Sequence, residues 1–337
     1  MMFNKNYPFF TGSSQQMKLH FKKYADWVKN YSKNKIKNVI EIGSNDGTFL
    51  KNFNPKNFNI LGFEPSENVA KRALKNGINT VSEFFNKKTT SKQKKFKKNT
   101  DLICAANVIC HIPDLNDLIQ SVDFMLNKNG LFVFEEPYLG SMFKKISYDQ
   151  IYDEHIFIFS GTSVSKIFSL FDLELIDVVP QITHGGSMRY VVARKNIYKV
   201  NNNVGKLLER EKLENLDNMS SCIEFKKNCE LSKKKTRGSL IKFQTDKNKI
   251  AGYAATSKST TILNYCNIDN NIIDYICDTT PEKIGKFSPG THIPIVDMSY
   301  FNKFTPDIAY LFAWNHKEEI LKKEKNYKGK WFSHVSL

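Results

Sequence analysis

Short apolar segments separated by helix-length intervals constrain the fold of this chain more than any other feature. The first half of the sequence contains four such segments, at residues 37–43, 59–64, 101–106 and 130–136. Each has the length of one β-strand, and each interval can hold a helix that carries the chain back to the same end of a sheet. This alternation predicts βαβ units and a largely parallel sheet. Two further segments, residues 173–179 and 188–194, are close enough in sequence to pair as antiparallel strands.

A second alternation begins after residue 247 and predicts a second domain. The strand-like segments there are residues 249–253, 273–278, 294–296 and 307–314. A charged stretch with apolar residues at helical intervals precedes them, and 337 residues are too many for one ordinary hydrophobic core. We therefore expect an α/β protein in four parts: a helical lead-in over residues 1–36, a Rossmann-like domain over residues 37–197, a helical linker over residues 198–247, and a second, smaller Rossmann-like domain over residues 248–337.

The formal net charge of +16 raises the question of a nucleic-acid partner. Only five of the 50 basic residues are arginine, the side chain that most often binds bases and phosphates bidentately. We therefore expect no nucleic-acid partner, and a lysine-covered surface that can attract a small anionic substrate.

Composition also bounds the location and the chemistry of the chain. No segment is long and apolar enough to cross a membrane, and the first residues lack a signal-peptide pattern. We expect a cytoplasmic protein without a membrane partner, either a monomer or a small homo-oligomer. The six cysteines lack zinc-ligand spacing, so no metal site is expected.

The end of the first strand carries an acidic residue followed by glycines. Glu41 precedes Gly43 and Gly47, and glycine lets the backbone approach a ligand closely. The pattern is neither G-x-G-x-x-G nor a P-loop, and a carboxylate here suits an ammonium group better than a pyrophosphate. The second strand ends at Glu64, where a carboxylate can bind ribose hydroxyls.

Two other places extend this predicted cofactor site. Glu83 and Phe84 follow a further strand-like stretch and can contact an adenine amine and ring. Asn107 and His111 follow the strand at residues 101–106, whose carboxyl end faces the ligand in such a fold, although a packed histidine is the alternative for His111. The full set assigned to the cofactor is Glu41, Gly43, Asn45, Gly47, Glu64, Pro65, Glu83, Phe84, Asn107 and His111.

Residues 149–160 concentrate titratable groups beside an apolar run, with Tyr152, Glu154 and His155 within four positions. Histidine is the natural general base near neutral pH, and a neighbouring carboxylate can orient or polarise it. Residues 183–190 form a second polar cluster, whose glycines permit close approach of a substrate. The turn at residues 252–259 supplies hydroxyls, backbone donors and a lysine at the start of a predicted helix, which favours phosphate.

In their order along the chain, these segments resemble the sugar C-methyltransferases that act on thymidine-diphosphate (dTDP)-linked 4-keto deoxysugars. The resemblance is closest to members that methylate C-3′ in tetronitrose biosynthesis. It extends over nearly the whole chain, and it is carried by residues 41–50, 62–66, 105–113, 136–140, 150–155, 184–186, 252–259, 278–281, 289–294 and 313–316. It implies a class I methyltransferase domain, S-adenosylmethionine (SAM) as cofactor and a nucleotide sugar as substrate.

The resemblance also implies roles for individual residues. The Y-x-E-H stretch of that family lies in the active site, which implies catalytic roles for Tyr152, Glu154 and His155. An N-terminal tyrosine of the family is assigned to Tyr7, with Phe9 as the alternative position. The second turn would hold the substrate's diphosphate. The set assigned to substrate binding is His184, Gly185, Arg189, Thr256, Ser257, Lys258, Ser259, His292 and Asn315. The family's N-terminal four-cysteine zinc module has no counterpart in this sequence, so zinc is not expected.

The implied reaction is a base-catalysed C-methylation. His155 would remove a proton from the carbon next to the ketone, Tyr152 would stabilise the enolate oxygen, and Glu154 would orient His155. The alternatives are O-methylation or another nucleotide sugar, an NAD-dependent oxidoreductase, and a non-catalytic RNA-binding protein. The single glycine in residues 252–259 disfavours NAD, whose fingerprint has three, and the scarcity of arginine disfavours RNA.

Overall fold

The structure is a computed structural model that describes residue 5 and residues 7–335, and these form two compact units. The first unit contains the described residues up to Pro137, together with Ile156–Gln181 and Ser187–Leu213. The second unit contains Tyr138–His155, Ile182–Gly186 and the described residues from Glu214 onward. Two short segments, Tyr138–His155 and Ile182–Gly186, therefore pack with the residues from Glu214 onward, although we expected both within the domain at residues 37–197.

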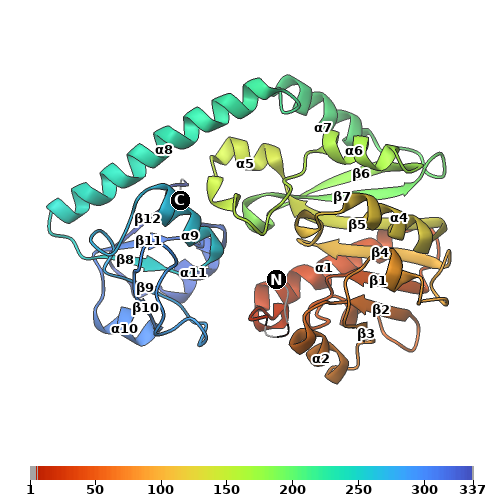
Figure 1. The fold of residues 1–337 in the computed structure, drawn as a ribbon, viewed down its shortest axis with the longest axis horizontal. Coiled ribbons are helices and arrows are strands. Elements are labelled where there is room, and N and C mark those ends of the chain that lie inside the picture. The colour runs from red at the N-terminus through yellow and green to blue at the C-terminus, as the bar shows by residue number, and fades with distance from the viewer. Residues whose placement is uncertain (1–4, 6, 336–337) are drawn as a thin grey trace. The chain divides into compact units, whose positions relative to one another are not determined.

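The first unit is built on a seven-stranded sheet with the order β3-β2-β1-β4-β5-β7-β6 (Figure 1). Its strands are β1 (Asn38–Ile42), β2 (Asn59–Phe63), β3 (Thr80–Val81), β4 (Thr100–Ala106), β5 (Leu126–Pro137), β6 (Leu173–Gln181) and β7 (Ser187–Arg194). The strands from β1 to β5 are parallel, and β7 runs antiparallel to both of its neighbours. The predicted parallel sheet and the predicted antiparallel pair are both confirmed.

Helices cover the sheet of the first unit. They are α1 (Gln15–Tyr31), α2 (Glu67–Lys75), α3 (Lys87–Thr90), α4 (Leu115–Met125), α6 (Gly161–Ser169) and α7 (Asn202–Leu213). Of these, α1, α3, α4 and α6 begin at side-chain caps. The Ser14 side chain accepts from Met17 N at the start of α1, and Asp114 accepts from Asp117 N at the start of α4. Each of these caps marks where its helix begins, at the change from turn residues to an amphipathic repeat.

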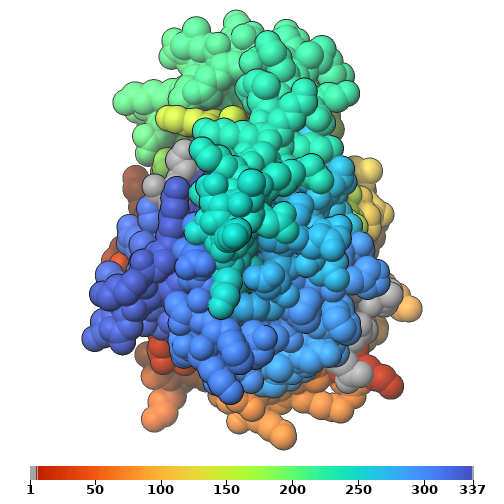
Figure 2. Space-filling model, turned by 90° about the vertical axis from the view of Figure 1, so that its left-hand side faces the viewer, coloured from red at the N-terminus to blue at the C-terminus, as the bar shows by residue number. Residues whose placement is uncertain are grey.

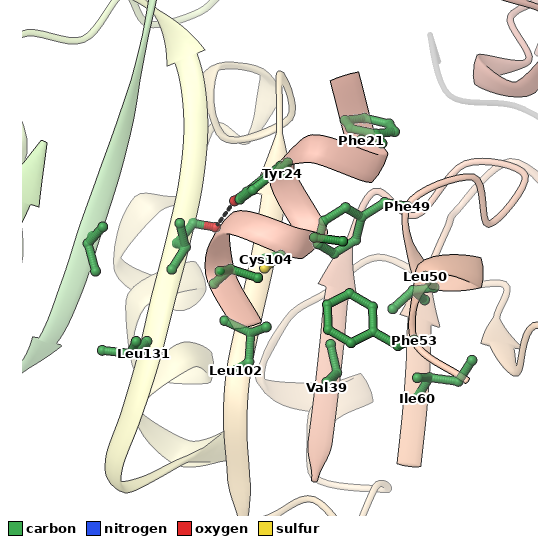
Figure 3. Close-up of a cluster of buried hydrophobic side chains, with 14 of the residues drawn as sticks. Phe21, Tyr24, Val39, Phe49, Leu50, Phe53, Ile60, Leu102, Cys104 and Leu131 are labelled. Carbon is green, nitrogen blue, oxygen red and sulfur yellow. Dashed lines mark hydrogen bonds between the residues drawn. The ribbon is translucent and has the colours of Figure 1, made fainter. Parts of the chain in front are cut away.

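The main core of the first unit lies between α1 and the sheet (Figure 3). Tyr24 projects from α1 onto the strands, and its hydroxyl donates to the carbonyl oxygen of Val133 at 2.8 Å. Phe49 and Phe53, from the segment after β1, pack beside it and are fully buried. This cluster fixes α1 and the turn after β1 against the same face of the sheet.

The second unit contains a five-stranded parallel sheet with the order β10-β9-β8-β11-β12. Its strands are β8 (Ile250–Tyr253), β9 (Tyr275–Cys277), β10 (Ile295–Val296), β11 (Ile308–Leu311) and β12 (Lys330–Phe332), and its helices are α5 (Leu139–Lys145), α8 (Met219–Thr245), α9 (Ser257–Tyr265), α10 (Met298–Lys303) and α11 (Lys317–Lys323). The second alternating sheet was predicted, but β12 was not. Most of α8 is exposed, and it forms the teal band in Figure 2.

No helix in the described part of the chain combines the length and the apolar character needed to span a bilayer.

Candidate active site

The turn after β1 packs against the loop that follows β4. Gly43 has a φ of 66°, and a Cβ on it would lie 2.4 Å from a methyl carbon of Val108. Gly47 has a φ of 80°, and a Cβ there would lie 2.6 Å from Ile78. Both positions therefore need glycine for backbone conformation and packing inside the first unit.

Two carboxyl groups lie buried at the ends of β1 and β2. Glu64 accepts hydrogen bonds from the backbone N–H groups of Ser66 at 2.8 Å and Asn45 at 3.0 Å. Burial raises the pKa of Glu64, although these hydrogen bonds act in the opposite direction. Burial also raises the pKa of Glu41 well above its usual value, and the carboxylates of Glu64 and Asp46 raise it further. The two acids predicted at successive strand ends thus affect each other electrostatically.

Several buried polar atoms at or just after the ends of β1, β2, β4 and β5 have no hydrogen-bond partner within residues 5 and 7–335. They are Glu41 Oε2, Ser44 Oγ, Ser66 Oγ, Asn107 Oδ1 and Glu136 Oε2. A buried carboxylate or amide oxygen is costly without a donor. A ligand that carries an ammonium group and ribose hydroxyls supplies such donors, so these residues fit SAM.

The loop after β4 is held by a buried acid at the end of β5. Glu136 Oε1 accepts from the backbone N–H groups of Val108 at 2.9 Å and Ile109 at 2.7 Å. Asn107, in the same loop, has a φ of 56° and donates its own N–H to the carbonyl of Glu135. Burial raises the pKa of Glu136 to about 7, although hydrogen bonds from the 108–110 segment lower it. Our sequence reasoning missed Glu136, and the available signal was an acid at the end of an apolar strand.

Three other predicted residues are exposed or have contacts of their own. Glu83 is about half exposed and pairs with Lys92 at 3.1 Å, and Phe84 is also exposed. Tyr7 is fixed to α2, where its backbone N–H and carbonyl both bind the Asn68 side chain. The roles of Glu83, Phe84 and Tyr7 stay predictions.

Arg189, predicted to bind substrate, is committed to contacts inside the first unit. Its guanidinium stacks over the rings of Tyr24 at 4.1 Å and Trp27 at 4.4 Å. Its Nε donates to Glu135 Oε1 at 2.7 Å, and the other oxygen of Glu135 contacts His20 Nε2 at 2.6 Å. With 4% of its surface exposed, Arg189 serves this ion-pair network.

Tyr152 and His155 form a hydrogen-bonded pair in the second unit. His155 Nδ1 lies 2.8 Å from the carbonyl oxygen of Gln150, which can only accept, so Nδ1 carries the proton. In the neutral ring Nε2 is then the acceptor, and the Tyr152 hydroxyl, 2.8 Å away, donates to it. The arrangement therefore directs the basic lone pair of His155 at the Tyr152 hydroxyl.

A backbone carbonyl holds the His155 ring, and the orienting role expected for Glu154 stays a prediction. The Gln150 carbonyl orients the His155 ring and fixes its tautomer. Glu154 is half-buried, and burial, with the neighbouring charge of Asp153 as a second cause, raises its pKa. Glu154, the neighbour of His155 in the sequence, is thus protonated more readily than an ordinary glutamate.

The start of α9 presents a buried cation. Thr256 caps the helix by accepting from Ser259 N at 3.1 Å, and Lys258 lies in its first turn. The Lys258 ammonium is buried, and it makes no hydrogen bond to residues in the described ranges. It lies 5.3 Å from the centre of the Trp314 ring. Burial lowers its pKa, and the carboxylate of Asp149 partly offsets that effect.

Asp149 is a second functional candidate that sequence reasoning missed. It is buried and accepts from Trp314 Nε1 at 2.8 Å, and it contacts His334 Nε2 at 3.2 Å. Burial raises its pKa, but the hydrogen bond and charge of His334, with further help from Lys258 and Trp314, bring it below its usual value. Asp149 therefore supplies a fixed negative charge near Lys258.

Trp314 also packs against Gly185, which was predicted, with His184, to bind substrate. Gly185 has a φ of 83°, and a Cβ on it would lie 2.1 Å from the Trp314 ring. Lys145 donates to the Gly185 carbonyl and lies 5.8 Å from the centre of the same ring. Asn315 follows Trp314 in a short 3-10 helix, Trp314–His316.

His292 lies in a separate turn of the second unit, with a φ of 53° and its N–H donating to the Ser288 carbonyl. The substrate contacts predicted for His292, and for Ser257 beside Lys258, stay predictions.

Comparison with known proteins divides the chain into two matched parts. Residues 16–178 match a methyltransferase domain family, and residues 182–335 match the C-methyltransferase C-terminal domain family. A curated relative, the C-methyltransferase NovU of Streptomyces niveus, is 29% identical over 290 residues, which are 86% of this chain and 69% of NovU. Neither matched family is a dehydrogenase or an RNA-binding family.

Solved structures with low sequence identity are also similar. A Pyrococcus horikoshii protein is 16% identical with a TM-score of 0.43, and the match covers 55% of this chain and 94% of that one. A SAM-dependent methyltransferase from Archaeoglobus fulgidus is 15% identical with a TM-score of 0.43, covering 53% and 94%. From the two family matches and the similarity to NovU, we conclude that the chain is a SAM-dependent methyltransferase whose second part is similar to the C-methyltransferase C-terminal domain family.

Proposed function

We propose that this methyltransferase C-methylates a 4-keto deoxysugar linked to a nucleoside diphosphate, with dTDP as the nucleotide. The observation that carries the proposal is the Tyr152–His155 pair, in which a neutral imidazole presents its Nε2 lone pair to a phenolic hydroxyl. A carbon next to a ketone is acidic enough for such a base, and removing its proton produces the carbon nucleophile that C-methylation needs.

The proton has a defined destination in this mechanism. When the C–H bond breaks, its electron pair passes to the enolate and its proton ends on His155 Nε2, directly or through the Tyr152 oxygen. The Gln150 carbonyl, 2.8 Å from Nδ1, stabilises the resulting imidazolium. Once Nε2 is protonated it donates to the Tyr152 oxygen, which frees the Tyr152 hydroxyl to donate to the former ketone oxygen and lower the energy of the enolate.

Bound SAM supplies the electrophilic methyl group. The unpartnered oxygen of Glu41 would accept from the ammonium group of SAM, and Glu64 would accept from its ribose hydroxyls. Asn107 Oδ1 is a further buried acceptor in the same unit. These residues hold and orient the cofactor, which reduces the entropic cost of the transfer.

We assign the substrate's diphosphate to the start of α9. Lys258 offers a buried ammonium that has no hydrogen-bond partner among the residues the structure describes, and the N-terminus of the nine-residue helix adds a favourable dipole. Because Asp149 is already bound to Trp314 and His334, it limits the net charge of the site without occupying the Lys258 donors. This assignment follows the resemblance to enzymes of nucleotide sugars.

Proton removal can be tested without methyl transfer. Incubation of the protein with a dTDP-4-keto deoxysugar in D2O, without SAM, should replace the hydrogen next to the ketone by deuterium, as seen by proton NMR. His155→Ala should slow this exchange by at least about 100-fold, because general-base catalysis contributes that much. Tyr152→Phe should slow it as well.

The matched control is Tyr300→Phe, which removes the hydroxyl of an exposed tyrosine in the same unit and should leave the rate unchanged. The proposal fails if the folded parent protein, with binding of S-adenosylhomocysteine verified by calorimetry, shows only the exchange rate of the buffer. It also fails if His155→Ala exchanges as fast as the parent.

A further inference from the structure

A basic pocket in the first unit is not used by the proposed reaction. It has a volume of about 550 Å³, which is in the range of small-molecule sites. Its floor includes Gly47, Thr48 and Ile78, and its rim includes the cations Lys18, Lys51 and Arg72. The start of α1, the segment after β1 and the end of α2, all in the red-to-brown part of Figure 1, contribute these residues.

The charges around the basic pocket do not balance. Asp46 is the acidic residue in its lining, and both of its oxygens are engaged, Oδ1 by the Thr48 hydroxyl at 2.6 Å and Oδ2 by Gly12 N at 3.0 Å. The three cations form no ion pair with any residue in the described ranges. The lining therefore carries two more positive than negative charges.

The presence of Arg72 distinguishes this pocket from the rest of the lysine-rich surface. The chain has five arginines. Arg189 and Arg194 pair with acids, Arg237 donates to the Asn267 carbonyl, and Arg210 also has an interaction. Within the described part of the chain, Arg72 is the arginine whose guanidinium has no protein partner. A guanidinium binds phosphate oxygens bidentately, which a lysine cannot do.

We propose that the basic pocket binds a small phosphate-bearing anion, through a bidentate contact from Arg72 and charge-assisted contacts from Lys18 and Lys51. Asn76, also in the lining, provides a neutral donor through its side-chain amide. The concave shape and limited volume favour a small molecule over a nucleic-acid backbone. This site differs from the diphosphate site proposed at Lys258, which belongs to the second unit.

The test uses inorganic pyrophosphate as the probe and Lys258→Met as the background, so that the proposed substrate site cannot contribute. Calorimetric titration of this full-length variant should show one saturable binding event. Adding Lys51→Gln and Arg72→Gln should raise the dissociation constant at least about tenfold, because charge-assisted hydrogen bonds are lost.

The control pair, Lys56→Gln and Lys75→Gln, removes the same charge from exposed positions outside the pocket lining and should leave binding unchanged. Circular dichroism verifies that each variant is folded. Orthophosphate and a nucleoside monophosphate, titrated in parallel, distinguish a free phosphate site from one for a phosphorylated metabolite. The proposal is overturned if Lys258→Met protein shows no saturable pyrophosphate binding, or if both pairs weaken binding equally. Failure of dTDP binding in the parent protein would affect only the proposed function.

Discussion

Glu136 shows how a single buried carboxyl group can make stability depend on pH. Its pKa in the folded chain is about 7, against 4.5 for an ordinary glutamate, because burial disfavours the charged form. The folded state therefore binds this proton more tightly than the unfolded state does. The resulting stabilisation is fully present below about pH 4.5 and is lost as the pH rises through 7.

Glu136→Gln should therefore be more stable than the parent protein at pH 8, by about 3 kcal/mol at most. The amide oxygen can still accept from Val108 and Ile109, and it has no charge to bury. The difference in free energy of unfolding should shrink toward pH 4.5. Urea unfolding at several pH values measures it, with the exposed Glu224→Gln as control. Parallel pH profiles for parent and Glu136→Gln would contradict this explanation.

At the same scale, sequence reasoning predicted residue types better than their partners. The pairing of Tyr152 with His155 follows from their spacing of three positions, and the structure has them 2.8 Å apart. The partners of Arg189 were not predictable, because they are Glu135, 54 positions earlier, and two aromatic rings of α1. Long-range partners of this kind leave no local signal.

At the scale of elements, strand ends and helix starts carry the candidate sites. The alternation of apolar segments predicted β1, β2, β4 and β5 because each contains a run of four or more consecutive buried residues. β12 was missed because it has only three residues, none of them buried. The grouping of Tyr138–His155 with the C-terminal half was missed for another reason, since contacts such as that of Asp149 with Trp314 span 165 positions.

The N-terminus of α6 provides an element-scale prediction. Glu211 of α7 is fully buried, and its two oxygens accept from Gly161 N at 2.7 Å and Thr162 N at 2.8 Å. Glu211→Ala removes these charge-assisted hydrogen bonds and should lower the free energy of unfolding by about 2–3 kcal/mol. Chemical denaturation measures the loss. Glu209→Ala, at an exposed position on the same helix, should cost less than about 0.5 kcal/mol, and equal losses would contradict the capping role.

At the scale of the whole molecule, the candidate roles divide between the two units. The first unit carries the unpartnered acceptors that fit SAM, and the second carries the Tyr152–His155 pair and the buried Lys258. The matched families divide the sequence at a different place, between residues 178 and 182, so the Tyr152–His155 pair lies within the methyltransferase-domain match although it packs with the second unit.

The most direct test of this account is to identify the atom that receives the methyl group. The protein is incubated with SAM labelled with ¹³C in its methyl group and with a dTDP-4-keto deoxysugar, and the product is examined by carbon NMR. Our account predicts a labelled methyl group bonded to the carbon next to the ketone, and its loss with His155→Ala. A labelled methyl on oxygen, or no transfer by a folded protein that binds S-adenosylhomocysteine and dTDP, would contradict it.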